Sequence, residues 1–381
     1  MQAIPLIRKK IGNSNLVWFE NSNSYVQLEE PAWFVVSKTA RRCKPATIAK
    51  AVELRYCISA SESQTFVNEI LTEVEKLNQL QVTVNKHIQW SDNLNKYNFT
   101  PFKIHSYLLG DKHVTFSFES RLFEHYIHPL ISHLETGPVT GAPPLFELFA
   151  HEQQVVFRFN GEVKGVWTSD ETHLMKGLIF MVLINVMHGK TDSNWLMTVH
   201  ASAITNKKKT ILFSAPPGHG KTTIAALMQS KGYELISDDF VPIDNLSFNA
   251  WPFPIAMSVK QGSMEVLTNH FPTLKQKKAT YISPEKSVRY LAPPDKLNSS
   301  KAAFPVHELV FIEYNTSIDF RFEKLDPIKG LKLLLDQAWI VPAPDNAKRL
   351  LELVPRISFF NLTYSDTEKA LEAIAELFNH E

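Results

Sequence analysis

The chain has 381 residues, too many for one ordinary domain, and its 44% apolar and 21% charged residues are typical of a globular protein. Its 40 Lys and Arg residues nearly cancel its 39 Asp and Glu residues, so the net charge does not favour binding of nucleic acid or of an anionic membrane. The two cysteines, Cys43 and Cys57, fall in no zinc-binding pattern, which indicates a reducing compartment.

The N-terminal segment has no apolar core of signal-peptide length. The longest apolar run, residues 177–187, is shorter than the ~20 residues of a membrane-spanning helix. We therefore expect a soluble, cytoplasmic protein that contacts no membrane and binds no nucleic acid.

Residues 1–90 are predicted to form a separate module, a hairpin followed by three short helices. Residues 16–19 and 25–28 have the apolar and β-branched character of strands. Helices are predicted around residues 33–36, after Pro45, and from Ser61, where Ser61 and Gln64 have the spacing of a capping box. The expected apolar faces contain Ile48, Val52 and Leu54 in the second helix and Phe66, Ile70, Val74 and Leu77 in the third.

Residues 91–195 are predicted to be rich in strands. Asn160 and Gly161 form a typical two-residue hairpin turn. Thr168 and Glu171 have the spacing of a second capping box, which opens a buried apolar helix that runs through Met187. The strands are expected at residues 107–109, 114–118, 145–150 and 155–159.

Residues 196–381 alternate strands with helices and complete a second domain, residues 91–381. A strand at 210–214, a turn at 215–220, a helix at 221–230 and a strand at 233–237 form a βαβ-type unit. A final helix is expected from Ser365 and Glu368, with Leu371, Ile374 and Phe378 on its apolar stripe.

The turn at residues 215–220 has the pattern of a phosphate-binding loop. Gly218 and Gly220 allow backbone N–H groups to face phosphate oxygens, and the following helix N-terminus adds a favourable dipole. Lys221 is placed to reach the β- and γ-phosphates, and the Thr222 hydroxyl to bind Mg²⁺. Ala215 stands where the strict pattern has glycine. The residues predicted to bind ATP are Pro217, Gly218, His219, Gly220, Lys221, Thr222 and Thr223.

Two carboxylates, Asp238 and Asp239, follow the second strand of this unit, where they can meet a metal ion held by phosphates. One of them is predicted to bind Mg²⁺ and the other to accept a proton from an incoming hydroxyl. His200, at the start of an apolar stretch just before the loop strand, is predicted to lie beside Asp238, which would orient the ring while the imidazolium tunes the carboxylate as a base. A turn and a structural histidine are the alternatives.

Residues 198–244 resemble the catalytic core of HPr kinase/phosphorylase, a bacterial serine kinase family, and also look like phosphoenolpyruvate carboxykinase. The resemblance rests on His200, the loop, Gly232 after the helix, and the Asp-Asp pair. It implies an α/β P-loop kinase core within an α+β protein. It also implies that ATP and Mg²⁺ are required, that chains associate as homo-oligomers, and that Asp238 with His200 handles the proton while Asp239 lies near the metal.

Two later segments, residues 251–262 and 288–294, look like HPr-kinase-related proteins of unassigned substrate that are often found near peptide-modification genes. Lys260 and Arg289 in these segments are candidates for contacts with the nucleotide or the acceptor, and solvated surface charges are the alternative. Residues 1–90 look like the small, winged-helix-like PqqD domain that grips leader peptides. This implies that residues 25–28 or 16–19 border a peptide groove. A packing module without a ligand is the alternative.

Together these features predict a phosphotransferase that uses Mg-ATP to phosphorylate a Ser or Thr hydroxyl on a peptide or small protein. Lys221, Asp238 and His200 are the predicted catalytic residues, and Thr222 and Asp239 the predicted metal ligands. Two alternatives stay open: a kinase of a small hydroxyl compound such as free serine, and a non-catalytic ATP sensor that binds a peptide.

Overall fold

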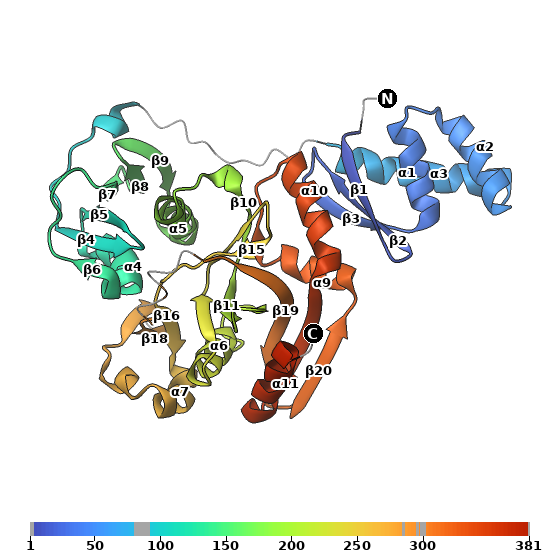
Figure 1. Ribbon diagram of the computed structural model, residues 1–381. Helices are drawn as coiled ribbons and strands as arrows, with labels where there is room; N and C mark the ends of the chain where they lie inside the picture. Colours follow the sequence, from blue (N-terminus) through green and yellow to red (C-terminus); the bar gives the residue numbers. More distant parts are fainter. Residues whose placement is uncertain (1–3, 80–91, 284–285, 295–296, 298–301, 380–381) are drawn as a thin grey trace. The chain divides into compact units, whose positions relative to one another are not determined.

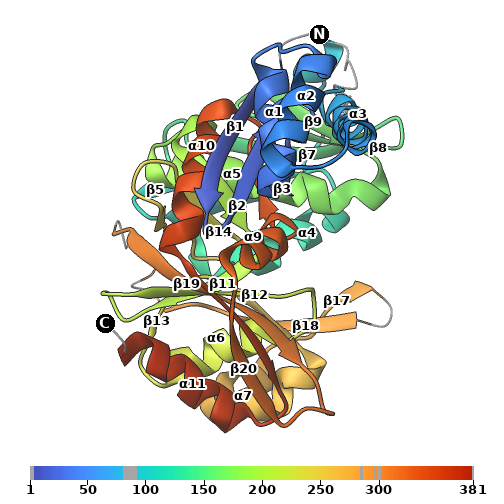
Figure 2. The ribbon, with the colours of Figure 1, turned by 90° about the vertical axis from the view of Figure 1, so that its right-hand side faces the viewer.

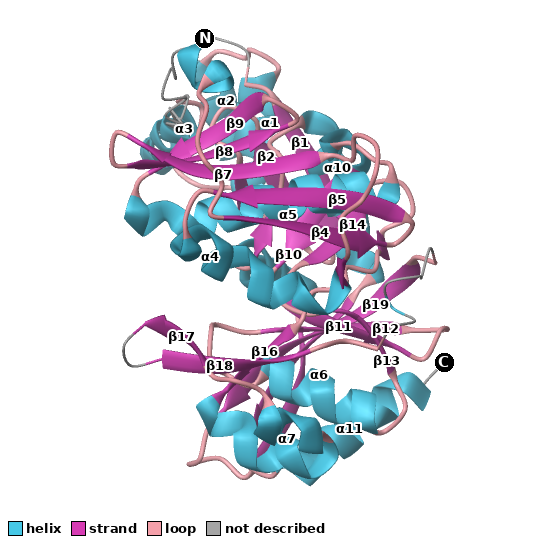
Figure 3. Cartoon of the chain, turned by 90° about the vertical axis from the view of Figure 1, so that its left-hand side faces the viewer, coloured by secondary structure: helices cyan, strands magenta, loops and turns pink. Residues whose placement is uncertain are grey.

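Helices and strands both occur throughout the described part of the chain, which comprises residues 4–79, 92–283, 286–294, 297 and 302–379 of the computed structural model (Figure 1). The strands form several separate sheets, which helices cover (Figure 3). The fold is therefore of mixed α/β type and agrees with the α+β class predicted from the sequence.

The first unit contains the described residues up to Gln79 and two later segments, Asp326–Lys332 and Ile340–Ile357. It is built on an antiparallel sheet of order β1-β2-β3 (Figure 1). Its elements are β1 (Leu6–Ile11), β2 (Ser14–Phe19), β3 (Ser24–Leu28), α1 (Glu30–Ala40), α2 (Pro45–Tyr56), α3 (Ala60–Leu77) and α10 (Pro344–Leu353).

The predicted hairpin is confirmed as β2 and β3, but the sheet also contains β1, which the sequence analysis missed. Three consecutive charged residues in β1 are exposed, so this strand carries no clear alternation of apolar and polar side chains. On the central strand, Val17 and Phe19 pack against Val36 of α1 and Val74 of α3. This packing joins the sheet to the helices.

The three predicted helices are present, with two corrections. The capping box of α3 is formed by Ser59 and Glu62, not by Ser61 and Gln64, since the Ser59 hydroxyl accepts the Glu62 N–H and the Glu62 carboxylate accepts the Ser59 N–H. Leu54 is 70% exposed, because at 100° per residue it lies far from the stripe of Ile48 and Val52. The other predicted positions, including Phe66 and Leu77, are buried or partly buried in the core.

The predicted boundary between residues 90 and 91 lies outside the described residues. The first unit differs from the predicted module in including α10, which packs against β1. The sequence predicts this helix within the second domain, because nothing local in residues 344–353 indicates a partner more than 300 residues earlier.

The second unit begins with a sheet of order β6-β4-β5-β7-β8-β9 (Figure 3). The predicted strands are confirmed, and Asn160 and Gly161 close the β8–β9 hairpin with φ angles of 52° and 83°. The elements of this part are β4 (Lys103–Leu109), β5 (Lys112–Phe118), α4 (Arg121–Ile131), β6 (Glu135–Thr136), β7 (Leu145–His151), β8 (Gln154–Phe159), β9 (Glu162–Trp167) and α5 (Thr172–His188).

Helices α4 and α5 cover one face of this sheet. Phe116, Phe146 and Phe157 of the sheet share one core with Ile127 of α4 and Ile179 of α5. The predicted capping box of Thr168 and Glu171 is present just before α5, and the apolar run at 177–187 lies within this helix as predicted. In the described part of the chain, no helix combines the length and the apolar character needed to cross a membrane.

The remaining strands form a larger mixed sheet of order β13-β11-β12-β19-β15-β14-β10-β21, with β22 beside β19 and β20 beside β22 (Figure 2). A small sheet of order β16-β18-β17 adjoins it. The strands are β10 (Trp195–Val199), β11 (Ala201–Thr205), β12 (Thr210–Ser214), β13 (Glu234–Ser237), β14 (Val241–Asp244), β15 (Asn249–Ala250), β16 (Met257–Lys260), β17 (Thr280–Ser283), β18 (Lys286–Leu291), β19 (Phe304–Tyr314), β20 (Phe320–Leu325), β21 (Ala338–Trp339) and β22 (Ser358–Tyr364).

The helices of this region are α6 (Lys221–Ser230), α7 (Met264–His270) and α11 (Thr367–Asn379), while α9 (Pro327–Leu335) belongs to the first unit up to Lys332. The predicted βαβ unit is present, but β12 and β13 are not neighbours. Each pairs antiparallel with β11, so they run parallel to one another with β11 between them. The predicted stripe of the last helix is buried against this sheet, while its first turn is capped by Asp366 rather than Ser365.

A partly buried histidine, His188, ends α5. Its ring lies 4.9 Å from that of Trp251 and 6.0 Å from that of Trp195, and its Nε2–H donates to the Pro252 carbonyl at 2.8 Å. Burial lowers the pKa of His188 from 6.5 to about 4. The folded chain therefore holds this ring neutral.

We predict that acid destabilises the fold through His188. Its pKa is higher in the unfolded chain, so its contribution to stability is complete above pH 6.5 and is lost as the pH falls towards 4. The loss is about 3 kcal/mol at most. In urea unfolding followed by Trp fluorescence at pH 7 and pH 4.5, His188→Gln should lose less stability on acidification than the wild type. An exposed control, His113→Gln, should behave as the wild type does. Equal losses in all three proteins would contradict the assignment.

Candidate active site

The predicted phosphate loop connects β12 to α6. β12 is fully buried and runs parallel to β19, which in turn runs parallel to β22. The loop therefore lies at the carboxyl end of these strands, where α/β sheets usually bind ligands. Its closest neighbours include the last residues of β19 and β22, since the Tyr314 N–H donates to the His219 carbonyl at 3.2 Å.

Two glycines give the loop its shape. Gly218 and Gly220 have φ angles of 102° and 99°, a left-handed region that other residues rarely adopt. A Cβ atom on Gly220 would lie 2.9 Å from the Tyr364 hydroxyl, and one on Gly218 would lie 3.9 Å from the Lys260 ammonium. The loop therefore requires glycine at position 220 for both its backbone conformation and its packing.

Lys221, the first residue of α6, is buried and contacts two side chains. Its Nζ lies 2.8 Å from Asp239 Oδ1 and 2.7 Å from His200 Nε2. This ion pair joins the start of α6 to the residues that follow β13. The predicted loop lysine and the predicted carboxylates therefore lie in one site.

Asp238 is almost fully buried and accepts hydrogen bonds from two hydroxyl-bearing side chains. Thr222 Oγ1 lies 3.1 Å from its Oδ2, and Ser202 of β11 donates to its Oδ1. Burial, together with the negative charge of Asp239, raises the pKa of Asp238. A cation at this carboxylate would oppose that shift.

Asp239 follows with a left-handed backbone, φ 66°, which is uncommon for an aspartate outside a turn. Its Oδ1 lies 3.5 Å from His200 Nδ1. Although burial acts in the opposite direction, the positive charge of Lys221 lowers the pKa of Asp239, and His200 acts in the same sense only when it is protonated. Burial lowers the pKa of His200, which favours its neutral form. The pKa values of the two neighbouring carboxylates are thus shifted in opposite directions.

The expected contact between His200 and Asp238 is not present: among the described residues, the carboxylate beside His200 is that of Asp239. The left-handed turn at Asp239 explains the difference, because it directs this side chain away from Asp238 and towards the ring. Thr222, predicted to bind metal with Asp239, instead contacts Asp238. The oxygen donors Thr222 and Asp238 are of the type that Mg²⁺ prefers, so this pair fits the metal that the loop implies.

Several contacting residues were not predicted. Ser202 lies within β11, two residues after His200, which directly precedes that strand. Thr223 Oγ1 lies 2.6 Å from Ser263 Oγ, which ties α6 to the segment after β16. Ser202 lies in an apolar stretch, so the sequence does not indicate that it donates a hydrogen bond to Asp238. No local pattern indicates the contact of Ser263 either.

The two predicted basic candidates differ in position. Val259 of β16 pairs with Arg289 of β18, so the two segments do lie together. The Lys260 ammonium is close to Gly218, and burial together with the charge of Lys221 lowers its pKa. Arg289 instead donates to the Lys277 carbonyl at 2.9 Å. Lys260 therefore remains a candidate for phosphate contacts, whereas Arg289 has a local structural partner.

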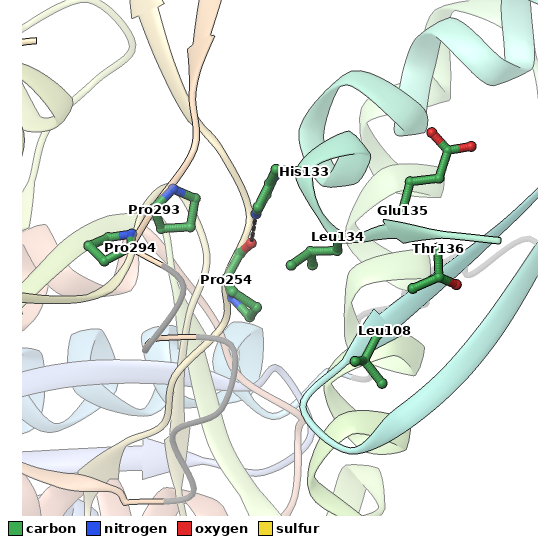
Figure 4. A pocket seen from close by; sticks show the side chains of 8 residues that line it. All are labelled: Leu108, His133, Leu134, Glu135, Thr136, Pro254, Pro293 and Pro294. Atoms are coloured by element: carbon green, nitrogen blue, oxygen red, sulfur yellow. Dashed lines mark hydrogen bonds between the residues drawn. The ribbon is translucent and has the colours of Figure 1, made fainter. Parts of the chain in front are cut away.

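Two other features of the second unit lie apart from these residues. A pocket of about 260 Å³ is lined by none of the predicted site residues (Figure 4); its lining is Leu108, His133, Leu134, Glu135, Thr136, Pro254, Pro293 and Pro294. His105, His128 and Glu135 form a polar cluster with possible metal-binding atoms. The rings of His105 and His128 stack at 4.2 Å and 15°, so their in-plane lone pairs do not converge on one ion.

In comparisons with known proteins, no family model matches this chain, and no curated protein matches it in sequence.

We predict that Gly220→Ala weakens binding of Mg-ATP by about tenfold or more, since strain at positive φ alone costs about 1–2 kcal/mol and the new methyl group meets Tyr364. Gly232→Ala is a matched control, because its φ is 101° and nothing lies within 4 Å of the added Cβ. In equilibrium titration, Gly232→Ala should bind Mg-ATP normally. Adding Tyr364→Phe to Gly220→Ala should restore part of the affinity; undiminished binding by Gly220→Ala would show that this loop does not hold phosphates.

Proposed function

We propose that this chain binds Mg-ATP at residues 215–223 and transfers the γ-phosphoryl group to a Ser or Thr hydroxyl of a peptide or small protein. The observation that carries the proposal is the meeting of Lys221 and Thr222 with Asp238, Asp239 and His200 at one end of the parallel strands. Phosphoryl transfer mainly requires positioning and charge neutralisation, and these groups supply both.

The loop glycines and the first residues of α6 would hold the phosphates, with Lys221 and Lys260 as the cations nearest to them. Thr222 and Asp238 would hold Mg²⁺, and the Ser202 hydroxyl would orient Asp238. Bound there, Mg²⁺ supplies charge neutralisation on the phosphate oxygens. This reverses the metal role that the resemblance implies for Asp239.

Asp239 and His200 would then handle the proton. The acceptor hydroxyl oxygen bonds to the γ-phosphorus, the bond to the β-phosphate oxygen breaks, and the hydroxyl proton passes to Asp239. Lys221 is paired with Asp239 and would have to turn towards the phosphates. Binding of the nucleotide would therefore free Asp239 for the hydroxyl, and His200 would keep it oriented.

The first unit supports a peptide as the acceptor. Its small antiparallel sheet has β3 at one edge, where an extended peptide can add as a further strand. Residues 16–19 belong to the central strand β2, which is paired on both sides. Of the two borders that the PqqD-like resemblance implies, residues 25–28 are therefore the proposed one.

We predict transfer of labelled γ-phosphate from Mg-ATP into a peptide or protein fraction of a lysate. Lys221→Ala should abolish this transfer and weaken ATP binding, because it removes the ammonium nearest the carboxylates. Lys208→Ala, an exposed lysine in the β11–β12 hairpin, should leave transfer intact. Label confined to small molecules would favour a kinase of a small hydroxyl compound. Equal label with Lys221→Ala would contradict phosphoryl transfer and favour an ATP sensor.

Substitution of each carboxylate in turn distinguishes the proposed roles of Asp238 and Asp239. Asp238→Asn should raise the Mg²⁺ concentration needed for half-maximal transfer by about tenfold or more, because a metal ligand loses its charge. Asp239→Asn should lower kcat by about 10²–10⁴-fold while leaving the Mg²⁺ requirement unchanged. Steady-state kinetics at varied Mg²⁺ measures both effects. The reverse result would support the pairing of His200 with Asp238 that the sequence predicts.

A further inference from the structure

Lys176 lies outside the loop, on helix α5, and its ammonium is within the electrostatic influence of Asp239. Lys176 lies on α5, one turn before Phe180, and residues four apart share a helix face. The Phe180 ring lies 5.7 Å from that of Phe240, the residue directly after Asp239. This contact places the Lys176 face of α5 against the carboxylate turn.

The charge of Lys176 has no counterion in the described part of the chain. Its ammonium lies 5.2 Å from the centre of the Tyr126 ring on α4, and no described carboxylate lies within the 4.0 Å of an ion pair. Burial lowers the pKa of Lys176, and the negative charge of Asp239 acts against this shift. A partly buried ammonium held only by an aromatic ring is costly, unless an anion binds beside it.

The nucleotide does not require this lysine. Lys221 begins the helix that follows the loop, and Lys260 lies close to Gly218, so these two cations are available to the phosphates. Lys176 approaches from α5, on the side of Asp239, the proposed proton acceptor. Burial and the negative charge of Asp239 also raise the pKa of the Tyr290 phenol on β18. An anion bound by Lys176 therefore belongs to the acceptor.

We propose that Lys176 binds a carboxylate that the acceptor carries close to its reacting hydroxyl. This rests on the proposed function and defines its substrate class as a hydroxyl compound with a neighbouring carboxylate. The carboxylate comes either from an acidic residue beside a Ser or Thr in a peptide, or from a small hydroxy acid. Lys176 thereby sets acceptor specificity, whereas Lys221 serves the nucleotide.

The test uses the full chain and two acceptor pairs that differ only in charge. One pair is L-serine and L-serinamide; the other is a Ser peptide flanked by Glu and the same peptide flanked by Gln. ADP formation should show a KM for the acid member that is lower by about 10–100-fold, as expected for one hydrogen bond between charged groups. The pair in which this preference occurs identifies the source of the carboxylate.

Lys176→Met should abolish the preference with little change in the KM for ATP, and Lys176→Arg should restore part of it. Lys208→Met is the control and should keep the preference. The proposal is overturned if the acid and amide members have equal KM values in the wild type, or if Lys176→Met keeps the preference. If Lys176→Met lowered kcat without changing either KM, Lys176 would act on the proton acceptor Asp239 rather than on the acceptor's carboxylate. This result would also overturn the proposal.

A second measurement does not depend on turnover. Acetylation of Lys176, followed by mass spectrometry in the presence of Mg²⁺ and a non-hydrolysable ATP analogue, should be slowed by the acid member of a pair and not by the amide member. Equal labelling with both members of both pairs would overturn the proposal. If the acid member protected Lys176 from acetylation, but no ADP formed in the kinetic test with ATP, the carboxylate site would exist and the proposed phosphoryl transfer would fail.

Discussion

The ion pair between Lys221 and Asp239 is the interaction on which the rest of the site depends. It joins the first residue of α6 to the turn after β13, and it places a positive charge beside two adjacent aspartates that would otherwise repel one another. Its effect is unequal: the charge of Lys221 favours ionisation of Asp239 against the effect of burial, whereas burial and Asp239 itself oppose ionisation of Asp238. Two chemically identical side chains thereby become suited to different tasks.

The order of the strands makes this pairing possible. Because β11 lies between β12 and β13, the loop after β12 and the turn after β13 flank the same strand. His200 and Ser202, two residues apart at its start, then reach one aspartate each. A βαβ unit with adjacent strands would bring the loop and the carboxylates together, but it would place no strand between them to supply a histidine and a serine.

The sheet of order β6-β4-β5-β7-β8-β9 is also connected to the carboxylate turn, through a helix that covers it. Its covering helix α5 carries Lys176 towards the carboxylate turn, where contact between Phe180 and Phe240 fixes the helix. The same helix buries Ile179 and Leu183 in the core of its own sheet. One element therefore serves both as a structural layer of its own sheet and as a neighbour of the carboxylate turn.

The sequence by itself determined the local features of this protein: the limits of β12 and α6, the Asn160 and Gly161 turn, the apolar helix α5, and the two glycines of the loop. Each depends on the periodicity or the backbone freedom of neighbouring residues, which the sequence displays directly. Only the tertiary structure decided that His200 meets Asp239 rather than Asp238, that Ser202 supports Asp238, and that α10 packs with β1. These contacts depend on the strand order, on one left-handed residue, and on side chains far apart in the chain, so no local pattern can reveal them.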